Sequence, residues 1–93
     1  MADFKVFETE QFLEDLAQDF KGRSERIAKK LRDHVYPQLR RNPHFGSNIK
    51  KLKNYQPETW RYRIGPYRFF YEIDEKEGIV YMLTVDARKD SYR

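Results

Sequence analysis

Apolar residues recur at helical spacing in two successive segments of the first half of the chain. The apolar positions are Phe12, Leu13, Leu16, Ala17 and Phe20 in the first segment and Ile27, Ala28, Leu31 and Val35 in the second. Both sets follow a 3.6-residue period, and Thr9 and Ser24 are suitable N-caps, with Gly22 as a stop between them. The pattern predicts two amphipathic helices that form a hairpin, the second of which Pro37 should kink or end.

The last third of the chain is rich in aromatic and β-branched residues, which is typical of β-strands. It divides into three strand-like segments, residues 60–64, 67–73 and 79–86. A short apolar-rich run at residues 4–7 can form a further strand, whereas residues 43–57 have the composition of a loop. We therefore predict a single α+β domain over residues 1–93. It has an N-terminal strand, a two-helix hairpin and a three-stranded antiparallel meander, with the helices packed on one face of the sheet.

The two-residue Gly65-Pro66 turn pairs Ile64 with Tyr67 and so determines which side chains share a face of the sheet. Directly opposed residues on neighbouring strands point to the same side. One face then carries Trp60, Tyr62, Ile64, Tyr67, Phe69, Tyr71 and Ile73, and the other carries Arg61, Arg63, Arg68, Phe70 and Glu72. The ring-rich face is the one that we expect the helices to cover.

The turn at residues 74–78 extends this pattern to the third strand of the meander. If it pairs Ile73 with Ile79, the third strand contributes to both faces. The ring-rich face gains Tyr81, Leu83 and Val85, and the arginine-bearing face gains Val80, Met82, Thr84 and Asp86, followed by Arg88 if the strand continues. A slip of one residue in the turn would exchange these two sets.

Arg63 lies directly opposite Arg68 in this register. Like charges that face each other across strands are destabilising, so folding alone does not favour the pair. Guanidinium groups bind phosphate oxygens in a bidentate manner and stay charged at any physiological pH. The pair therefore indicates either a preformed phosphate site or a chance alignment of two surface arginines.

Positive charge is concentrated in the middle of the chain, although the net charge is only +4. Residues 21–63 contain thirteen lysines and arginines against three acidic residues. Such an asymmetry in a small domain favours a polyanionic partner, most often a nucleic acid. For any single basic residue, the alternative is an ordinary solvated helix face.

Several classes of site and location are excluded or disfavoured. The chain has no cysteine, which excludes disulfides and thiol chemistry, and its two histidines show no metal-ligand spacing, so we expect no metal and no cofactor. Its apolar runs are too short to span a membrane, and the start at Met1-Ala2-Asp3-Phe4 is too polar for a signal peptide. These features predict a cytoplasmic protein.

Two motifs resemble those of the RelE/ParE toxin superfamily. Residues 60–73 read W-R-Y-R-x-G-x-Y-R-x-x-Y-x-I, and the tail from Arg88 to Tyr92 reads R-K-D-x-Y. Together with the order of the predicted elements, they make the resemblance extend over the whole chain. It implies the toxin of a type II toxin–antitoxin pair, neutralised by a small cognate antitoxin protein.

The resemblance leaves three activities open. RelE-like members are ribosome-dependent endoribonucleases that cut mRNA without a metal, by attack of a 2′-hydroxyl on the adjacent phosphate, and so inhibit translation. ParE-like members share the fold and inhibit DNA gyrase. A third possibility is a degenerate member that binds RNA without cleaving it. Of these we expect the mRNA endoribonuclease.

The resemblance also implies roles for particular residues. The catalytic set would be Arg61, Arg63, Arg68, Arg88 and Tyr92. The arginines would hold the scissile phosphate and stabilise its transition state, and Tyr92 would stack on a base. RNA binding would involve Arg40, Arg41, Lys50, Lys51 and Lys53.

The chain departs from the family pattern at the general base. RelE-type enzymes often carry lysine where this chain has Arg61 and Arg63, and an arginine cannot in practice accept a proton. Many relatives also have Gly-His where this chain has Asp86-Ala87. The base is therefore open among Lys53, His44, Glu72, Asp86 and Asp90.

Three apolar residues are expected on the arginine-bearing face, namely Phe70, Val80 and Met82. Apolar side chains clustered on a charged face often mark a contact site. We therefore expect the antitoxin to contact this group.

Overall fold

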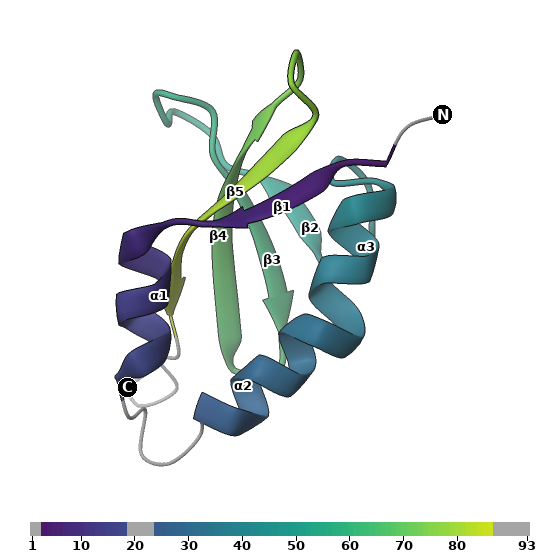
Figure 1. Ribbon diagram of the computed structural model, residues 1–93. Helices are drawn as coiled ribbons and strands as arrows, with labels where there is room; N and C mark the ends of the chain where they lie inside the picture. The colour runs from purple at the N-terminus through teal and green to yellow at the C-terminus, as the bar shows by residue number, and fades with distance from the viewer. Residues whose placement is uncertain (1–2, 19–23, 87–93) are drawn as a thin grey trace.

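The computed structural model describes residues 3–18 and 24–86 as a five-stranded sheet with helices on one face (Figure 1). The strands are β1 (Lys5–Glu8), β2 (Ile49–Lys51), β3 (Trp60–Ile64), β4 (Tyr67–Asp74) and β5 (Ile79–Asp86). The helical segments are α1 (Glu10–Ala17), α2 (Ser24–Lys30), a π-helical turn (Leu31–Val35) and α3 (Tyr36–Arg41). The strand order is β1-β5-β4-β3-β2, in which β1 runs parallel to β5 and the other neighbours are antiparallel.

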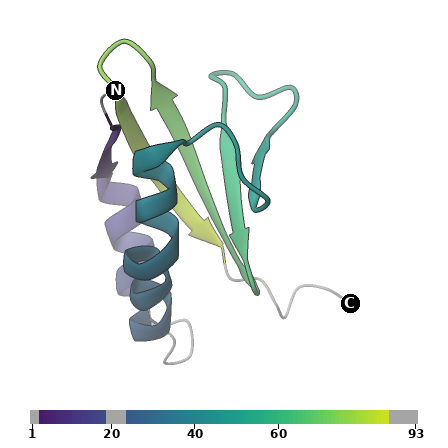
Figure 2. The ribbon, with the colours of Figure 1, turned by 90° about the vertical axis from the view of Figure 1, so that its right-hand side faces the viewer.

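The helices lie together on one side of the sheet, as the second view shows (Figure 2). The opposite side carries no helix of the described chain, and we call it the outer face. The predicted α+β class and the packing of helices on one face are both confirmed.

α1 begins at the predicted N-cap and continues along the edge of β5. The Thr9 hydroxyl accepts a hydrogen bond from the Phe12 backbone N–H and donates one of 2.6 Å to the Met82 carbonyl oxygen. Further along α1, the Asp15 carboxylate accepts a hydrogen bond of 3.3 Å from the Val85 backbone N–H. Because β1 pairs with β5 only as far as Met82, α1 supplies partners for the edge of β5 where β1 has ended.

The second helical run continues from Ser24 to Arg41 without stopping at Pro37. A proline inside an α-helix lacks an N–H donor and clashes with the carbonyl four residues earlier. Here the turn before it is widened, since the Tyr36 N–H donates to the Leu31 carbonyl five residues back. The predicted disturbance is therefore absorbed by a π-helical turn rather than by an end of the helix.

The two-residue turn sets β3 against β4 in the predicted register. Ile64 lies opposite Tyr67, and Gly65 takes a positive φ of 58°, which glycine adopts without strain. The expected loop before β3 contains a strand that the sequence did not indicate. This strand, β2, pairs antiparallel with β3 and has only three residues, too few to show an alternation of apolar and polar positions.

The turn between β4 and β5 pairs Asp74, rather than Ile73, with Ile79. This slip of one residue turns Val80 and Met82 towards the helices, where both side chains are fully buried. Their expected place on the arginine-bearing face is therefore wrong. As neither residue has exposed surface, neither can be the antitoxin contact that the sequence suggested.

A β-bulge then restores the predicted faces in the second half of β5. Tyr71 lies opposite Met82, but its neighbour Phe70 lies opposite Thr84, so that Leu83 is the extra residue. Before the bulge Tyr81 points to the outer face, against the prediction, while beyond it Val85 points to the helices and Thr84 and Asp86 to the outer face, as predicted.

The core between sheet and helices contains five aromatic rings among its buried residues. Its members are Phe12, Ile27, Leu31, Val35, Leu39, Tyr62, Tyr67, Phe69, Tyr71, Val80, Met82 and Val85. Leu13, Ala17 and Ala28 were expected to face inward but are exposed, because the helices contact the sheet through a narrower stripe. Phe20 lies outside the described residues.

Tyr71 joins this core to the connection after α3. Its hydroxyl is buried and donates a hydrogen bond of 2.8 Å to the Pro43 carbonyl, and its ring stacks on Trp60 with the centroids 6.5 Å apart. Burial raises the pKa of Tyr71, with a smaller contribution from Tyr62, so the phenol remains a donor at neutral pH.

We predict that Tyr71→Phe lowers the free energy of unfolding by about 1–3 kcal/mol, because it leaves the Pro43 carbonyl buried without its donor. Urea denaturation at pH 7 measures the difference. Tyr55→Phe, which removes a hydroxyl from a half-exposed ring, is the matched control and should change stability by less than about 0.5 kcal/mol. Equal stability of wild type and Tyr71→Phe would contradict this assignment.

Candidate functional site

Two cross-strand rows of side chains place the basic residues of the sheet on the outer face. The first row runs Lys50, Arg61, Phe70 and Thr84, and the second runs Arg63, Arg68 and Asp86. The rows are two residues apart along β3, a distance of ~7 Å. The outer face thus presents four cations within two neighbouring rows, of which Arg61, Arg63 and Arg68 are the expected catalytic arginines.

Asp86 offsets the repulsion between the opposed arginines of the second row. The Arg68 Nη2 atom lies 3.3 Å from the Asp86 Oδ2 atom, and the two side chains are 22% and 23% exposed. Arg63, on the neighbouring strand β3, is exposed. The ion pair therefore restrains the Arg68 guanidinium, while the Arg63 guanidinium stays accessible to an anion from solvent.

Arg61 is held differently from the other two arginines. Its Nε atom is buried and has no hydrogen-bond partner among the residues that the structure describes. A buried donor without a partner lowers the stability of the fold, because it has lost its hydrogen bonds to water, until an acceptor reaches it. Arg61 thus has unused hydrogen-bonding capacity in the row that also contains Phe70 and Thr84.

The other basic residues expected to bind RNA do not gather around these rows. Lys51 shares the row of Trp60, on the helix-covered side, where its Nζ atom lies 5.8 Å from the Trp60 ring centroid and 3.1 Å from the Glu58 carboxylate. Arg40 and Arg41 end α3 in the helix layer. Of the five expected residues, only Lys50 lies in a row with a predicted catalytic arginine.

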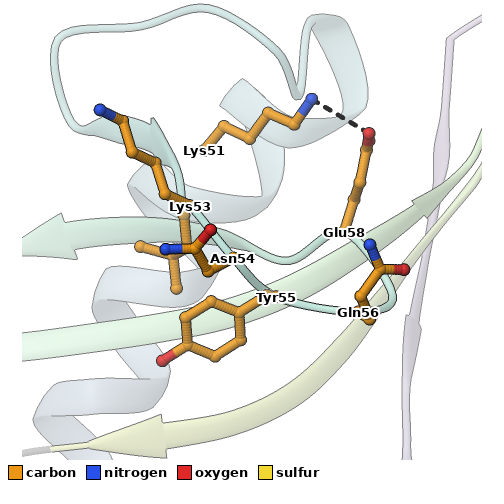
Figure 3. Close-up of a pocket in the computed structure, with 7 residues that line it drawn as sticks. Lys51, Lys53, Asn54, Tyr55, Gln56 and Glu58 are labelled. Atoms are coloured by element: carbon orange, nitrogen blue, oxygen red, sulfur yellow. Dashed lines mark ion pairs between the residues drawn. The ribbon is translucent and has the colours of Figure 1, made fainter.

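Lys53 belongs to the loop between β2 and β3. Residues 51–56 and Glu58 line an open hollow in this loop, where the close-up shows the Lys51–Glu58 ion pair and the Tyr55 ring projecting away from the Lys53 amine (Figure 3). Lys53 is exposed there. The structure therefore leaves it in the loop rather than in either row.

The described candidates for the general base lie on different sides of the sheet. His44 Nε2 lies 2.7 Å from the Glu75 carboxylate, and its ring packs against Trp60 with the centroids 5.4 Å apart. Since Trp60 points to the helix-covered side, His44 lies across the sheet from Arg61. Glu72 and Asp86 lie on the outer face, and of these Asp86 is the one in contact with an arginine.

Three residues singled out from the sequence, Arg88, Asp90 and Tyr92, lie outside the described residues. Within the described part of the chain, no group of His, Asp and Glu side chains could hold a metal ion. No described helix is long and apolar enough to cross a membrane.

Two outer-face residues were not found from the sequence. Leu83 was assigned to the ring-rich face because a β-bulge leaves no mark in the pattern of a single strand. Tyr55 stands in a segment whose composition indicates only a loop. Both lie against Phe70 on the outer face, next to the first basic row.

Several solved structures with this architecture come from toxin–antitoxin systems. In the RelBE2 toxin–antitoxin complex of Mycobacterium tuberculosis, the matching chain has a TM-score of 0.74 and 28% identity, over 92% of this chain and 99% of that one. The YoeB dimer of Staphylococcus aureus matches with a TM-score of 0.66 and 20% identity over 89% and 94% of the chains. A mutant of the Escherichia coli toxin RelE matches with a TM-score of 0.63 and 22% identity, over 98% of this chain and 88% of that one.

The two matches at 20% and 22% identity show the fold alone, which is RelE-like as predicted. No curated protein matches the chain in sequence. The family of the ParE toxin of type II toxin–antitoxin systems matches residues 8–92, nearly the whole chain. This chain therefore belongs to the ParE toxin family of type II toxin–antitoxin systems, within the RelE/ParE superfamily that its motifs resemble.

Proposed function

We propose that this toxin is a metal-independent endoribonuclease that cleaves mRNA on the ribosome. The observation that carries the proposal is the pair of basic rows on the outer face, with Arg61 and Lys50 in one and Arg63 and Arg68 in the other. Opposed arginines weaken a sheet; the ion pair between Asp86 and Arg68 offsets part of this repulsion, and a bound phosphate would offset more of it. A guanidinium fork binds phosphate oxygens in a bidentate manner, and a phosphodiester is the anion that every nucleic acid supplies.

The reaction transfers a phosphoryl group within the RNA. The 2′-hydroxyl oxygen forms a bond to the adjacent phosphorus, the bond to the 5′-oxygen breaks, and the products are a cyclic phosphate and a free 5′-hydroxyl. Charge accumulates on the non-bridging oxygens in the transition state, where positioned guanidinium groups stabilise it most. Arg63 is the accessible contact to the phosphate and Arg68 the restrained one.

The proton of the 2′-hydroxyl needs an acceptor, which neither Arg61 nor Arg63 provides. Among the described carboxylates, Asp86 lies in the row of Arg63 and Arg68, and Glu72 lies further along β4. We place Asp86 first because it contacts Arg68, one of the arginines that we propose to bind the phosphate. The proton returned to the 5′-oxygen comes from a group that we leave unassigned.

The partners follow from the same proposal. Matching structures from Mycobacterium tuberculosis, Pyrococcus horikoshii and Methanococcus jannaschii are toxin–antitoxin complexes. We propose a cognate antitoxin for this chain too, with the ribosome and mRNA as its targets. Since Val80 and Met82 are buried, Phe70 is what remains of the expected antitoxin contact on the outer face.

A gyrase inhibitor is the second candidate, and the family match favours it, because the matching family is that of the ParE toxin. Such a toxin acts by binding a protein and has no need of basic rows that fit phosphates. The two functions differ in their products: DNA breaks with intact mRNA in one case, and cut mRNA with intact DNA in the other. A degenerate toxin would bind RNA and cut nothing.

We expect Arg63→Gln to weaken binding of a short single-stranded RNA and to reduce the slope of log K against log salt by about 0.7, the value for one phosphate contact. Fluorescence anisotropy of a labelled hexanucleotide, titrated at several salt concentrations, measures both quantities.

The matched control is Arg32→Gln. It removes the same charge from an exposed position in the helix layer, on the other side of the sheet. If both variants lose affinity equally, the attraction depends on net charge, and the outer face has no special role in binding RNA.

We expect Arg68→Ala to reduce cleavage of mRNA by about 100-fold or more, as removal of one transition-state contact does in other phosphoryl and acyl transfers. Primer extension on a defined message during in vitro translation locates and quantifies the cuts. Arg32→Ala should cut like the wild type, and a thermal melt checks that Arg68→Ala remains folded. Cleavage by folded Arg68→Ala at the wild-type rate would refute the assigned role.

A further inference from the structure

The outer face contains an apolar pocket whose lining residues, Phe70 apart, have no role in the proposed function so far. Its lining residues are Tyr55, Thr59, Phe70, Leu83 and Thr84. It lies where the loop before β3 meets the outer side of β4 and β5, and its volume of about 310 Å³ is at the lower end of the range for small-molecule sites.

The polar atoms of the two threonines in this wall are already used. The Thr59 hydroxyl donates to the Pro57 carbonyl at 3.0 Å, and the Thr84 hydroxyl donates to the Asp15 carboxylate. The pocket therefore presents methyl groups and rings to a ligand. Such a surface binds the face of a flat apolar group and does not read hydrogen-bonding edges.

The β-bulge of β5 is what provides one wall. As the extra residue of the bulge, Leu83 adds an aliphatic side chain next to Thr84 on the outer face, where regular alternation would have turned it to the helices. The loop before β3 contributes Tyr55 to the same pocket; this residue is 54% exposed and its ring projects from the loop (Figure 3). The pocket thus has one fixed wall and one ring that can be removed without opening the core.

The charges beside the pocket identify its occupant. Phe70 and Thr84 lie in the same cross-strand row as Lys50 and Arg61, and the row of Arg63 and Arg68 is the next one. A chain of phosphates bound along these cations would bring its bases against the pocket. A protein partner could pair carboxylates with the same cations, but only a nucleic acid carries a flat ring beside every phosphate.

We infer that this pocket receives one unstacked base of the RNA substrate, and that the Tyr55 ring stacks on it. The inference rests on the proposed endoribonuclease function and adds a base-binding subsite to it. Stacking on aromatic side chains is how proteins hold single-stranded RNA once its bases are splayed apart. Because the walls consist mainly of rings and methyl groups, the subsite positions the strand for cleavage with little preference for one base.

The experiment combines a change in the protein with a change in the RNA. Ribosomes are programmed with synthetic mRNAs that carry an abasic nucleotide at one position of the A-site codon or just after it, and cleavage is followed for wild type and Tyr55→Ala. We expect Tyr55→Ala to reduce the cleavage of intact mRNA by about 10-fold, the scale of one stacked base. At the position that the pocket holds, the abasic nucleotide should reduce cleavage by the wild type as much as Tyr55→Ala does. It should not reduce cleavage by Tyr55→Ala any further.

Tyr55→Phe is the conservative variant: because it keeps the ring, it should restore the cleavage of intact mRNA that Tyr55→Ala loses. Two outcomes would overturn the pocket assignment and leave the proposed function standing. In the first, Tyr55→Ala cleaves mRNA as well as the wild type does; in the second, Tyr55→Ala and the abasic nucleotide reduce cleavage additively at every position. Wild-type protein that cuts no message would overturn both. Weaker antitoxin binding by Tyr55→Ala with unchanged RNA cleavage would assign the pocket to the antitoxin instead.

Discussion

The β-bulge at Leu83 is the constraint on which both the core and the candidate site depend. Val80 and Met82 point to the helices before it, and Val85 does so after it. Strict alternation cannot place all three of these side chains on one face, because a residue and its third neighbour lie on opposite sides. One extra residue resolves the conflict, so that the core is filled from both halves of β5 and Asp86 reaches the outer face beside Arg68.

The same extra residue explains why the site could be predicted only in part. The turn at Gly65-Pro66 allows one pairing, and the arginine rows of β3 and β4 follow from it by counting. The longer turn before β5 allows pairings that differ by one residue, and each shift of one residue exchanges the side chains that β5 presents to the two faces of the sheet. The predicted face of the sheet was thus correct for Arg61, Arg63 and Arg68, wrong for Val80 and Met82, and correct again for Asp86 because the slip and the bulge cancel.

Other differences from the sequence prediction have similar local causes. Pro37 was expected to kink or end its helix; the helical run continues past it, and a π-helical turn upstream accommodates it. The lysines of β2 were expected to act together, yet Lys50 and Lys51 are neighbours on a strand and so point to opposite faces. Charge patterning along a sequence shows how many cations are present. Only the pairing of strands shows which of them can bind one ligand.

On the outer face, the charged rows and the apolar pocket would contribute differently to the binding of RNA. In the proposed function, the basic rows would attract a polyanion and give affinity without selecting a sequence or a position. An apolar pocket beside them can select a strand whose bases are unstacked, which a duplex does not offer. Both features meet on β5, where Asp86 restrains Arg68 and Leu83 forms the pocket wall. Because α1 holds this part of β5 through Asp15, which bonds the Thr84 hydroxyl and the Val85 N–H, the helix layer sets the geometry of the opposite face.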